Sequence, residues 1–571
     1  MKNELTVRIA GEAGQGMKTI GSALCMLGKK TGLHIFSNYD YMSRIRGGNN
    51  YYQVRFSRHP VYTLRSRADI IVALDKNSVT VHKKNCTDQG ILVLDREKFN
   101  IEKEEPFHFN VPFYRMAKET GGKDLYVNAV AFGMVGGFIG VPESAVEEVM
   151  EKIFAGKSQE LIDTNTQCAS AGYRFSSNNK DRDFTLKTEK ERDQELVMNG
   201  NDAIALGAIA AGCSFYSAYP MTPSTSIMNV FAHNAKKKSI VVEQAEDEIA
   251  AVNMVIGASF AGCRAMCATS GGGFALMQEG VSLAGMTETP VVIVDSQRPA
   301  PATGFPTRTE QADLDFVIHA GHGEFARAVF SPGSIDECFY LTRKAFDLAD
   351  KYQIPVIILT DQHLADSYRN IYPFDTGKAG GDRYIISKKE SKNISEYRRY
   401  QDTTSGISPR AIPSWISDVV YADSDEHDEE GHITERADVR ITMVKKRLCK
   451  KMAKLIEEIV QPVCMHCENA DTILVGFGST FGVMRELVEV NGDKNTGMIH
   501  LPQIWPFPSE AISRVLKNKK KIVSVENNAA GQLARLIRRE TGIEVSGRIK
   551  KFDGRPFDID FFSTAVQQEV R

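Results

Sequence analysis

The sequence predicts an α/β fold made of three α/β domains, and three observations support this prediction. The chain has 571 residues, which is too many for a single hydrophobic core. Short, fully apolar segments recur along it, as is typical of parallel strands that helices cover on both faces. Between them lie segments in which apolar residues repeat at the helical spacing of three and four.

The composition argues against several classes of protein. The chain is 42% hydrophobic and 25% charged with a formal net charge of −2, which gives no electrostatic reason to expect nucleic acid or an anionic membrane as partner. No segment approaches the roughly 20 apolar residues of a membrane span. The N-terminus, Met1–Leu5, lacks the apolar core of a signal peptide, and the ten cysteines show no disulfide-scaffold spacing. We therefore expect a cytoplasmic protein.

Residues 1–175 form the first predicted domain. Its first strand runs into a glycine turn, Gly11–Gly16, that precedes a helix, and such a turn can cradle an anion or a nucleotide. The spacing is not the dinucleotide-binding fingerprint, so a turn that only allows close helix packing is an equal alternative. The charged range 176–198 is predicted to be a linker. Apolar strands are expected at 5–10, 69–74 and 90–95.

Residues 199–375 form the second predicted domain, and its polar residues gather where strands end. Further apolar strands are expected at 290–295 and 354–360. Open α/β sheets bind ligands at the carboxyl ends of their strands. We therefore predict a ligand site built from four segments, 219–223, 242–248, 269–273 and 297–307.

Residues 376–462 break the α/β pattern and are predicted to be a connector. Within it, Asp423–His432 brings carboxylates and two histidines together, as a metal loop would. The spacing does not match a calcium loop, and a zinc site needs another histidine or cysteine. We favour an ordered polar connector at the surface or at a subunit contact, followed by one helix with a basic surface at 439–460. Residues 463–571 form the third, smaller α/β domain, resembling the others in its strand-to-helix turns.

The cysteines are not expected to bind a metal. Cys464 and Cys467 form a single C-x-x-C pair, whereas zinc or an iron–sulfur cluster needs about four ligands. Cys263 and Cys267 lie in an Ala- and Gly-rich segment. We interpret both pairs as small buried hydrophobes, with a redox role for Cys464 and Cys467 as the less favoured alternative.

Four acidic residues crowd the start of the helix predicted at 245–263. A helix dipole stabilises negative charge there, which accounts for Glu243, Glu246 and Asp247. Glu248 differs because alanines follow it two and three positions later and leave its helix face with little cover. A carboxyl group held in such an apolar pocket can exchange a proton with a ring nitrogen, as general acid–base catalysis requires.

Restrained polar residues flank this acid in the sequence. Thr222 lies between two prolines, which fix its backbone and aim its hydroxyl group. Arg298 precedes a proline and could bind a carboxylate through two parallel hydrogen bonds. Thr303, Gly304 and Thr307 would add hydroxyl and backbone donors nearby.

These segments occur together with Ser424–Asp428 and Glu526–Gln532. In this combination the chain resembles the 2-oxoacid:ferredoxin oxidoreductases, thiamine diphosphate enzymes that oxidatively decarboxylate 2-oxoacids to acyl-CoA. The resemblance extends over essentially all 571 residues. The chain looks like the alpha subunit with the gamma domain fused at its N-terminus. This implies a pyrimidine-type thiamine diphosphate domain in the middle and a transketolase C-terminal-like domain at the end.

The resemblance also implies roles for individual residues. Glu248 would hydrogen-bond the aminopyrimidine ring nitrogen of the cofactor and promote its activation. The substrate carboxylate and keto oxygen would be bound by Thr222, Arg298 and Thr307. The cofactor would be contacted by Tyr219, Pro220, Glu248, Gly271 and Gly272.

The resemblance further implies that this chain holds half of the active site. A separate beta subunit would hold the diphosphate, Mg²⁺ and a [4Fe-4S] cluster, and the sequence lacks both a Gly-Asp-Gly motif with a following Asn and a four-cysteine motif. CoA would accept the acyl group and ferredoxin would accept the electrons. The complex would be a dimer of alpha–beta heterodimers, and the isolated chain would be inactive. The fused arrangement favours 2-oxoglutarate, with branched-chain 2-oxoacids and pyruvate as alternatives.

Two readings from other classes stay open on the residues alone. A transketolase- or decarboxylase-like thiamine enzyme would need no electron acceptor, but it would normally carry both cofactor halves in one chain. A non-catalytic nucleotide-binding assembly subunit would use Gly11–Gly16, and Glu248 would then be an ordinary helix acid.

Overall fold

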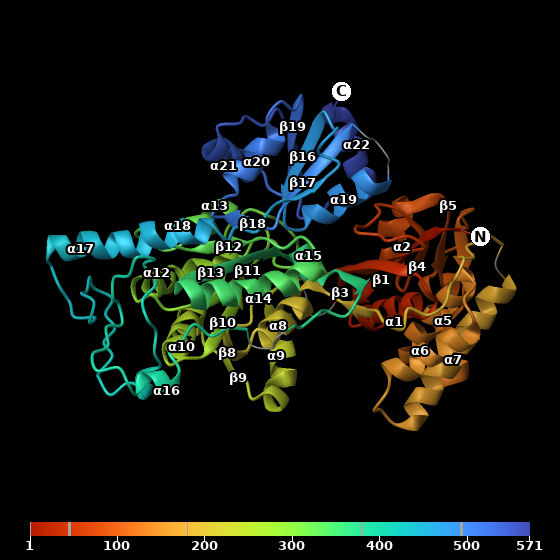
Figure 1. Ribbon diagram of the computed structural model, residues 1–571. Coiled ribbons are helices and arrows are strands. Elements are labelled where there is room, and N and C mark those ends of the chain that lie inside the picture. Colours follow the sequence, from red (N-terminus) through yellow and green to blue (C-terminus); the bar gives the residue numbers. More distant parts are fainter. Residues whose placement is uncertain (1, 44–46, 180, 378–380, 491–494, 571) are drawn as a thin grey trace. The chain divides into compact units, whose positions relative to one another are not determined.

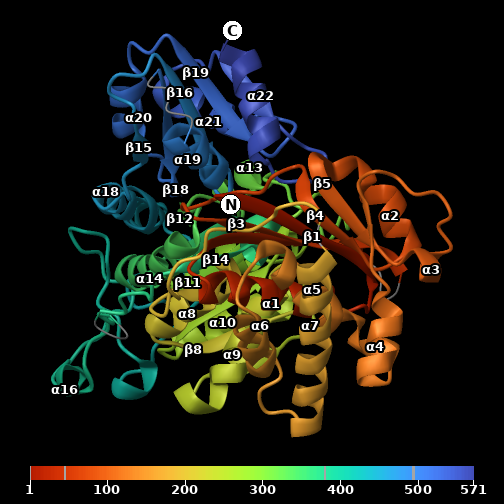
Figure 2. The same ribbon diagram turned by 90° about the vertical axis from the view of Figure 1, so that its right-hand side faces the viewer.

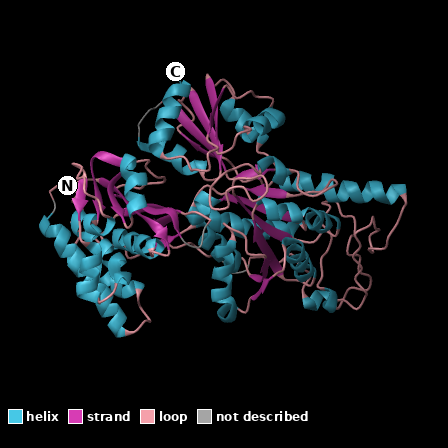
Figure 3. Ribbon diagram, turned by 180° about the vertical axis from the view of Figure 1, so that it is seen from behind, coloured by secondary structure: helices cyan, strands magenta, loops and turns pink. Residues whose placement is uncertain are grey.

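The computed structural model describes residues 2–43, 47–179, 181–377, 381–490 and 495–570 (Figure 1). Across these residues the strands form three sheets of eight, seven and five strands, each accompanied by helices (Figure 3). The predicted α/β class is therefore confirmed. The chain divides into a first compact unit (Met1–Asn199, Asp366–Pro373 and Phe557–Thr564) and a second one (Gly200–Ala365, Phe374–Pro556 and Ala565–Arg571).

The first unit contains the eight-stranded sheet, in the order β6-β5-β4-β1-β3-β2-β14-β7. β1, β4, β5 and β6 run parallel, whereas β3 is antiparallel to both β1 and β2. The three apolar segments predicted in this domain fall in β1, β4 and β5. The strands are β1 (Glu4–Ala13), β2 (His34–Asp40), β3 (Gly47–Ser57), β4 (Ala68–Ala73), β5 (Cys86–Leu94), β6 (His108–Asn110), β7 (Leu196–Met198) and β14 (Tyr368–Ile371).

The long helices of the first unit lie side by side (Figure 2). Glycine lets α5 and α7 approach closely, because a Cβ atom on Gly133 would lie 1.8 Å from the carbonyl oxygen of Ala169. α7 continues to Asn179, into the range 176–198 that we predicted to be a linker. The helices are α1 (Met17–Lys30), α2 (Lys76–His82), η1 (Lys83–Asn85), α3 (Arg96–Phe99), α4 (Phe113–Gly121), η2 (Asp124–Tyr126), α5 (Val127–Ile139), α6 (Glu143–Ile153) and α7 (Gln159–Asn179).

The seven-stranded sheet is the centre of the second unit, in the order β18-β12-β13-β11-β10-β8-β9. Its strands are parallel except for β18, which comes from the C-terminal part of the chain and pairs antiparallel with β12. The strands are β8 (Cys213–Ala218), β9 (Val241–Gln244), β10 (Arg264–Thr269), β11 (Val291–Gln297), β12 (Ala328–Phe330), β13 (Pro355–Asp361) and β18 (Gln503–Trp505).

Helices cover this sheet because alternate strand residues point to opposite faces. The strand residues that point to one face, including Cys267, Ile293 and Ile357, belong to the same core as Val255 of α10 and Val281 of α12. α8 and α14 pack against each other and against the sheet. The helices are α8 (Gly200–Ala210), α9 (Thr225–Lys238), α10 (Glu248–Phe260), α11 (Gly271–Leu276), α12 (Gln278–Met286), α13 (Leu314–Ile318), α14 (Ile335–Tyr352) and α15 (Gln362–Asp366).

The five-stranded sheet follows the order β15-β17-β16-β19-β20. Its strands are parallel apart from β15, which is antiparallel to β17. Val475 of β16 and Leu536 of α21 belong to the same core as α10, so one apolar core spans both sheets of this unit. The elements are β15 (Val463–Met465), β16 (Thr472–Phe477), α19 (Thr480–Val490), β17 (Thr496–Leu501), α20 (Ser509–Leu516), β19 (Lys521–Glu526), α21 (Gln532–Thr541), β20 (Gly547–Lys550) and α22 (Ile559–Val570).

The acidic loop Asp423–His432 is an ordered polar connector, as predicted. Glu426 pairs with Arg440 at 2.5 Å and with Arg447 at 2.7 Å. Oδ1 of Asp428 accepts hydrogen bonds from the backbone N–H groups of the last three residues of the loop. Within the described ranges, no three His, Cys, Asp or Glu side chains are grouped so that they could hold a metal ion. Short helices precede the loop, α16 (Lys388–Ser391) and η3 (Pro413–Trp415).

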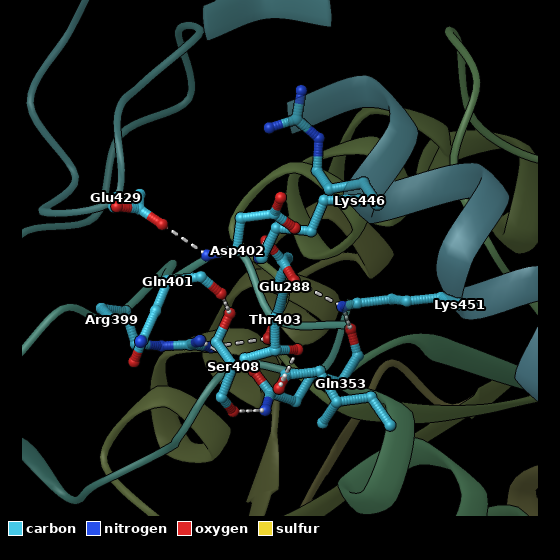
Figure 4. A network of polar contacts seen from close by, with 12 residues as sticks. Glu288, Gln353, Arg399, Gln401, Asp402, Thr403, Ser408, Glu429, Lys446 and Lys451 are labelled. Carbon is cyan, nitrogen blue, oxygen red and sulfur yellow. Dashed lines mark hydrogen bonds and ion pairs between the residues drawn. The ribbon is translucent and has the colours of Figure 1, made fainter. Parts of the chain in front are cut away.

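The helix after this loop runs without interruption through α17 (Ala437–Val444), the π-helical segment η4 (Lys445–Lys450) and α18 (Lys451–Ile456). The prediction of a basic surface is wrong for part of it, because Lys446, Arg447 and Lys451 are buried. Both lysines pair with the buried Glu288 (Figure 4), at 2.5 Å for Lys451. A π-helical turn brings residues five apart onto one face, so the irregularity lets both lysines reach one carboxylate.

Among the helices in the described part of the chain, none combines the length and the apolar character that a membrane span requires.

Candidate active site

The four polar segments predicted to form a site lie at one edge of the seven-stranded sheet. β9, β8, β10 and β11 are parallel neighbours, so their carboxyl ends meet at the same edge. Segment 219–223 follows β8, segment 269–273 follows β10, and segment 297–307 follows β11, while α10 begins soon after β9. The structure thus brings together the segments that the sequence grouped.

Glu248 is the one acidic residue of the cluster before α10 that is buried. Its side chain is 3% exposed, whereas Glu243 and Glu246 are exposed and Asp247 caps the helix by accepting from the N–H of Ala250 at 2.7 Å. The hydroxyl of Thr269 lies 3.4 Å from Oε1 of Glu248. Oε2 accepts no hydrogen bond from any described residue. A buried carboxylate with one free oxygen fits a ligand that offers a ring nitrogen.

The glycine run surrounds this carboxylate. A Cβ atom on Gly273 would lie 2.4 Å from Oε1 of Glu248, and one on Gly271 would lie 2.4 Å from Oδ2 of Asp313. Both glycines therefore permit close packing within the protein. Gly272 differs, because it is exposed and a Cβ atom there would meet only the carbonyl oxygen of Ala302, at 3.9 Å. Its backbone faces open space that a ligand can enter.

Arg298 and Thr222 are adjacent in the structure. Nη1 of Arg298 donates to the backbone carbonyl of Thr222 at 2.7 Å. The guanidinium group is half-buried; burial lowers the pKa of Arg298, and the negative charge of Glu248 opposes this effect. Thr307 is buried, at 7% exposure, whereas Thr303 is exposed at the tip of the loop. Arg298 therefore contacts Thr222 and lies close enough to Glu248 to interact with its charge.

Tyr219 and Pro220 lie at the outer rim of the site. Tyr219 is 41% exposed and Pro220 is half-buried. The next residue, Met221, fixes this segment, since the hydroxyl group of Ser270 lies 2.8 Å from its sulfur atom. The contact joins the segment after β8 to the glycine run after β10.

Two carboxyl groups that no sequence motif indicates lie behind the glycine run. Asp295 is fully buried, and neither of its side-chain oxygens has a hydrogen-bond partner among the described residues. It pairs in register with Thr269, the residue that reaches Glu248. Burial and then the charge of Asp313 raise the pKa of Asp295 well above its ordinary value of 3.8, and burial also raises the pKa of Asp313. A proton kept on Asp295 removes a buried negative charge and its repulsion with Asp313.

Replacing Asp295 should change how stability depends on pH. Because the pKa of Asp295 is raised in the fold, the folded chain keeps a proton that the unfolded chain releases, and stability falls as pH rises above the ordinary value of 3.8. Asp295→Asn removes this loss, so its thermal midpoint should exceed that of the wild type at pH 8 and approach it at pH 5. We expect a difference on the order of 1–3 kcal/mol between the two pH values.

Calorimetry of the isolated chain at both pH values measures this effect. Asp425→Asn, at an exposed position, is the control and should shift the midpoint equally at pH 5 and pH 8. A pH-independent effect of Asp295→Asn would contradict a proton kept on Asp295 in the folded chain.

The N-terminal glycine turn has a structural explanation in the first unit. Gly14 and Gly16 have positive φ angles of 95° and 68°, which disfavour other residues. A Cβ atom on Gly16 would lie 2.2 Å from Nδ2 of Asn128. These features support the interpretation of Gly11–Gly16 as a tight turn with close packing. The range Ser43–Asn50, which has two arginines beside glycines in the sequence, is a further candidate loop. Its residues from Gly47 onward belong to strand β3, and residues 44–46 lie outside the described residues.

The prediction that both cysteine pairs are buried is correct for two of the four residues and only in part for a third. Cys267 and Cys467 are buried, and Cys263 is partly buried. The prediction is wrong for Cys464, which is exposed at the edge strand β15.

Three parts of the chain match families of known proteins. Residues 6–175 match pyruvate ferredoxin/flavodoxin oxidoreductase, and residues 206–446 match the thiamine diphosphate-binding part of pyruvate flavodoxin/ferredoxin oxidoreductase. Residues 470–561 match core domain II of pyruvate:ferredoxin oxidoreductase. The site described above therefore lies in the part whose family is described as thiamine diphosphate-binding.

Relatives cover the whole chain. A 2-oxoacid:ferredoxin oxidoreductase subunit alpha of Sulfolobus sp is 32% identical over 99% of this chain and 96% of that protein. A 2-oxoglutarate synthase subunit of Methanothermobacter marburgensis is 33% identical over 64% of this chain and 97% of its own length. The solved 2-oxoglutarate:ferredoxin oxidoreductase of Magnetococcus marinus, with 2-oxoglutarate, coenzyme A and succinyl-CoA bound, is 31% identical with a TM-score of 0.92 over 100% of both chains. The chain belongs to the 2-oxoacid:ferredoxin oxidoreductase family, as an alpha subunit.

Proposed function

We propose that this chain is the alpha half of an enzyme that oxidatively decarboxylates 2-oxoglutarate. The reaction converts the 2-oxoacid and CoA to acyl-CoA and carbon dioxide, and two electrons pass to ferredoxin. The observation that carries the proposal is the buried carboxylate of Glu248, with one free oxygen, beside Arg298 and the open face of Gly272.

The residues present fit thiamine diphosphate. Oε2 of Glu248 offers a hydrogen-bonding position for a ring nitrogen inside a buried pocket, and Gly272 leaves room for a flat ring. The chemistry that thiamine diphosphate supplies when bound is a nucleophilic carbon and an acceptor for the electron pair left by carbon dioxide. Glu248 would hold and move the proton at the ring nitrogen. Tyr219, Pro220 and Gly271 complete the wall proposed for the cofactor.

Arg298, Thr222 and Thr307 form the proposed substrate site. A guanidinium group binds a carboxylate through two parallel hydrogen bonds, and threonine hydroxyl groups suit a keto oxygen. The hydrogen bond from Arg298 to the carbonyl oxygen of Thr222 holds the guanidinium group in place before substrate arrives. Orientation of the carboxylate at this position would hold the keto carbon near the cofactor.

The other half of the site is proposed to come from a beta subunit. Large apolar side chains are exposed on α10 and α11 beside Glu248: Ile249 at 49%, Met254 at 36% and Leu276 at 50%. A subunit that covers them would exclude water from the carboxylate. That subunit would hold Mg²⁺, the diphosphate and the [4Fe-4S] cluster, in a dimer of alpha–beta heterodimers, and the isolated chain would be inactive.

Two relatives favour 2-oxoglutarate over other 2-oxoacids. The Methanothermobacter protein is described as a 2-oxoglutarate synthase subunit, and the Magnetococcus structure contains 2-oxoglutarate and succinyl-CoA. Branched-chain 2-oxoacids and pyruvate are the alternatives, because the family names cover 2-oxoacids in general and pyruvate in particular. All of these substrates share the 2-oxo carboxylate that Arg298 is proposed to bind.

Reconstitution with the cognate beta subunit tests the proposal. The complex, with thiamine diphosphate, Mg²⁺ and CoA, is assayed for viologen or ferredoxin reduction against a panel of 2-oxoacids. We expect the highest kcat/KM with 2-oxoglutarate. A higher value with pyruvate or a branched-chain acid would reject the substrate, and a complex inactive with every 2-oxoacid would reject the function.

Replacement of Arg298 should lower kcat/KM for the substrate while leaving the fold intact. Arg298→Lys keeps the charge but loses the second parallel hydrogen bond, so kcat/KM should fall by about 10–100-fold, equivalent to roughly 1.4–2.7 kcal/mol. Steady-state kinetics of the reconstituted complex measure the change. Arg535→Lys, at an exposed arginine that pairs with Asp315, is the control and should leave kcat/KM unchanged. Equal kinetics in the two variants would remove Arg298 from the site.

A further inference from the structure

The C-terminal domain begins with a pair of cysteines in different environments. Cys464 is exposed on β15, an edge strand whose residues pair with β17. Cys467 lies three residues later, is 8% exposed and belongs to the apolar core of the second unit. Between them His466 has a positive φ angle of 55°, so the backbone turns sharply from the strand. The turn follows directly after the strand that carries Cys464 and leads the chain into the core at Cys467.

Sγ of Cys467 lies 3.6 Å from the carbonyl oxygen of Met465, the residue next to Cys464. It also lies 3.1 Å from the carbonyl oxygen of Met498 on β17. The buried thiol therefore has two backbone acceptors within reach, one on each of the paired strands. The Cys467 side chain is thus directed back toward the strand that carries Cys464.

Positive charge gathers around the pair. Nζ of Lys519 donates to the carbonyl oxygens of Cys467 and Ala470, at 2.5 Å and 2.9 Å, and so binds the turn. The hydrogen bond from Cys467 lowers the pKa of the Cys464 thiol to about 7; burial opposes this effect, and the charge of Arg514 adds to it. Low-pKa, accessible thiols in electropositive surroundings are the reactive ones.

The other cysteines lack this combination. Cys449 is exposed but has no cysteine neighbour in the sequence, and burial raises the pKa of both Cys213 and Cys267 to about 12. A metal site is not indicated at the pair, because the described residues provide no group of three ligands there. What distinguishes Cys464 and Cys467 is an exposed thiol of lowered pKa three residues from a buried thiol.

We propose that Cys464 and Cys467 form a reversible dithiol–disulfide couple, with Cys464 as the attacking group and Cys467 as the resolving group. The oxidant is a low-molecular-weight disulfide. The Cys464 thiolate attacks one of its sulfur atoms, the S–S bond breaks, and the first thiolate leaves. Cys467 then loses its proton and attacks Sγ of Cys464, and the second thiolate leaves. Two electrons and two protons pass from the cysteine pair to the small disulfide, and a small dithiol reverses the reaction.

The fold can accept both states. Oxidation removes the contact of the Cys467 thiol with Met498, but β15 remains paired with β17 through its backbone. Lys519 holds the turn through carbonyl oxygens, which the reaction does not change. Oxidation is therefore expected to join the two sulfur atoms and to remove the exposed Cys464 thiolate, without changing the backbone around them.

The couple is tested on the full chain with mixtures of oxidised and reduced glutathione. After alkylation of free thiols, mass spectrometry should show a peptide with Cys464 joined to Cys467, and dithiothreitol should restore both thiols. Cys467→Ser should stop at a stable glutathione adduct on Cys464, and Cys464→Ser should give neither product at this pair. Cys449→Ser is the matched control and should form the disulfide as the wild type does.

The pH dependence of alkylation gives an independent readout. Cys464 in the wild type should react with a midpoint near pH 7, and this midpoint should rise toward the ordinary thiol value of 9.0 in Cys467→Ala, which keeps the core apolar. A stable glutathione adduct on wild-type Cys464 with no disulfide would overturn the proposal. So would an alkylation midpoint that Cys467→Ala leaves unchanged.

Discussion

Glu248→Gln should reduce the turnover of the reconstituted complex by a factor of about 10²–10⁴, the range that a single general acid–base group supplies. Glutamine has nearly the same shape but cannot take up or release the proton at the proposed ring nitrogen. The fold should be unaffected, because the only hydrogen bond that Glu248 accepts from the described residues is the long one from Thr269, at 3.4 Å. Turnover with saturating 2-oxoglutarate and CoA measures the loss.

Glu246→Gln is the matched control for this variant. The residue lies two positions earlier and is exposed, so its replacement should leave turnover within the error of the assay. Calorimetry of both isolated variants should give the thermal midpoint of the wild type. Near-normal turnover of Glu248→Gln, with a normal thermal midpoint, would contradict the proposed catalytic role of Glu248. It would leave the assignment of the chain to its family unchanged.

Glu288→Gln should destabilise the chain more than any other change considered. The ammonium groups of Lys446 and Lys451 would stay buried without their counter-charge (Figure 4), and breaking such a pair costs about 3–5 kcal/mol. The free energy of unfolding of the isolated chain in urea measures the loss. Asp438→Asn breaks the exposed pair with Arg436 instead and should cost at most about 1 kcal/mol.

The effect of Glu288 should also vary with pH in a defined direction. Burial alone would raise its pKa, but the charges of Lys446, Lys451 and Arg399 hold the pKa well below the ordinary value of 4.5. The carboxylate therefore stabilises the fold above that ordinary value, and the contribution is lost as pH falls below it. The difference between wild type and Glu288→Gln should be complete at pH 7 and shrink in acid. A difference that stays constant down to pH 3 would argue against the ion pairs.

The sequence could predict Glu248 because local rules suffice there. An acid at a helix start, followed by alanines, is buried when that helix face packs, whereas the neighbouring acids face solvent. The positions of Thr222 and Arg298 can also be predicted from local pattern, because each follows an apolar strand and parallel strands end at a common edge of the sheet. These residues could be grouped without knowing which strands pair.

Other features depend on contacts between distant parts of the chain. Asp295 closes an apolar strand, which is itself unusual, but its meaning depends on Asp313, and only the fold brings the two together. In the sequence, Lys446 and Lys451 fit a solvated basic helix face, because their partner, Glu288, lies about 160 residues earlier. Cys464 is predicted to be buried because free cysteines usually behave as small hydrophobes, but it lies on an edge strand, which leaves one side open.

Because β18 pairs with β12, the seven-stranded sheet cannot be completed until the C-terminal part of the chain is present. During synthesis the backbone groups of β12 at the sheet edge stay unpaired until residue 505 has been made. Until then the sheet carries an open edge of the kind that recruits other strands and promotes aggregation. A chain terminated before β18 would keep every residue proposed for the cofactor and the substrate, yet it would be prone to self-association. The residues proposed for the site and the strand that covers the sheet edge therefore belong to one folding unit.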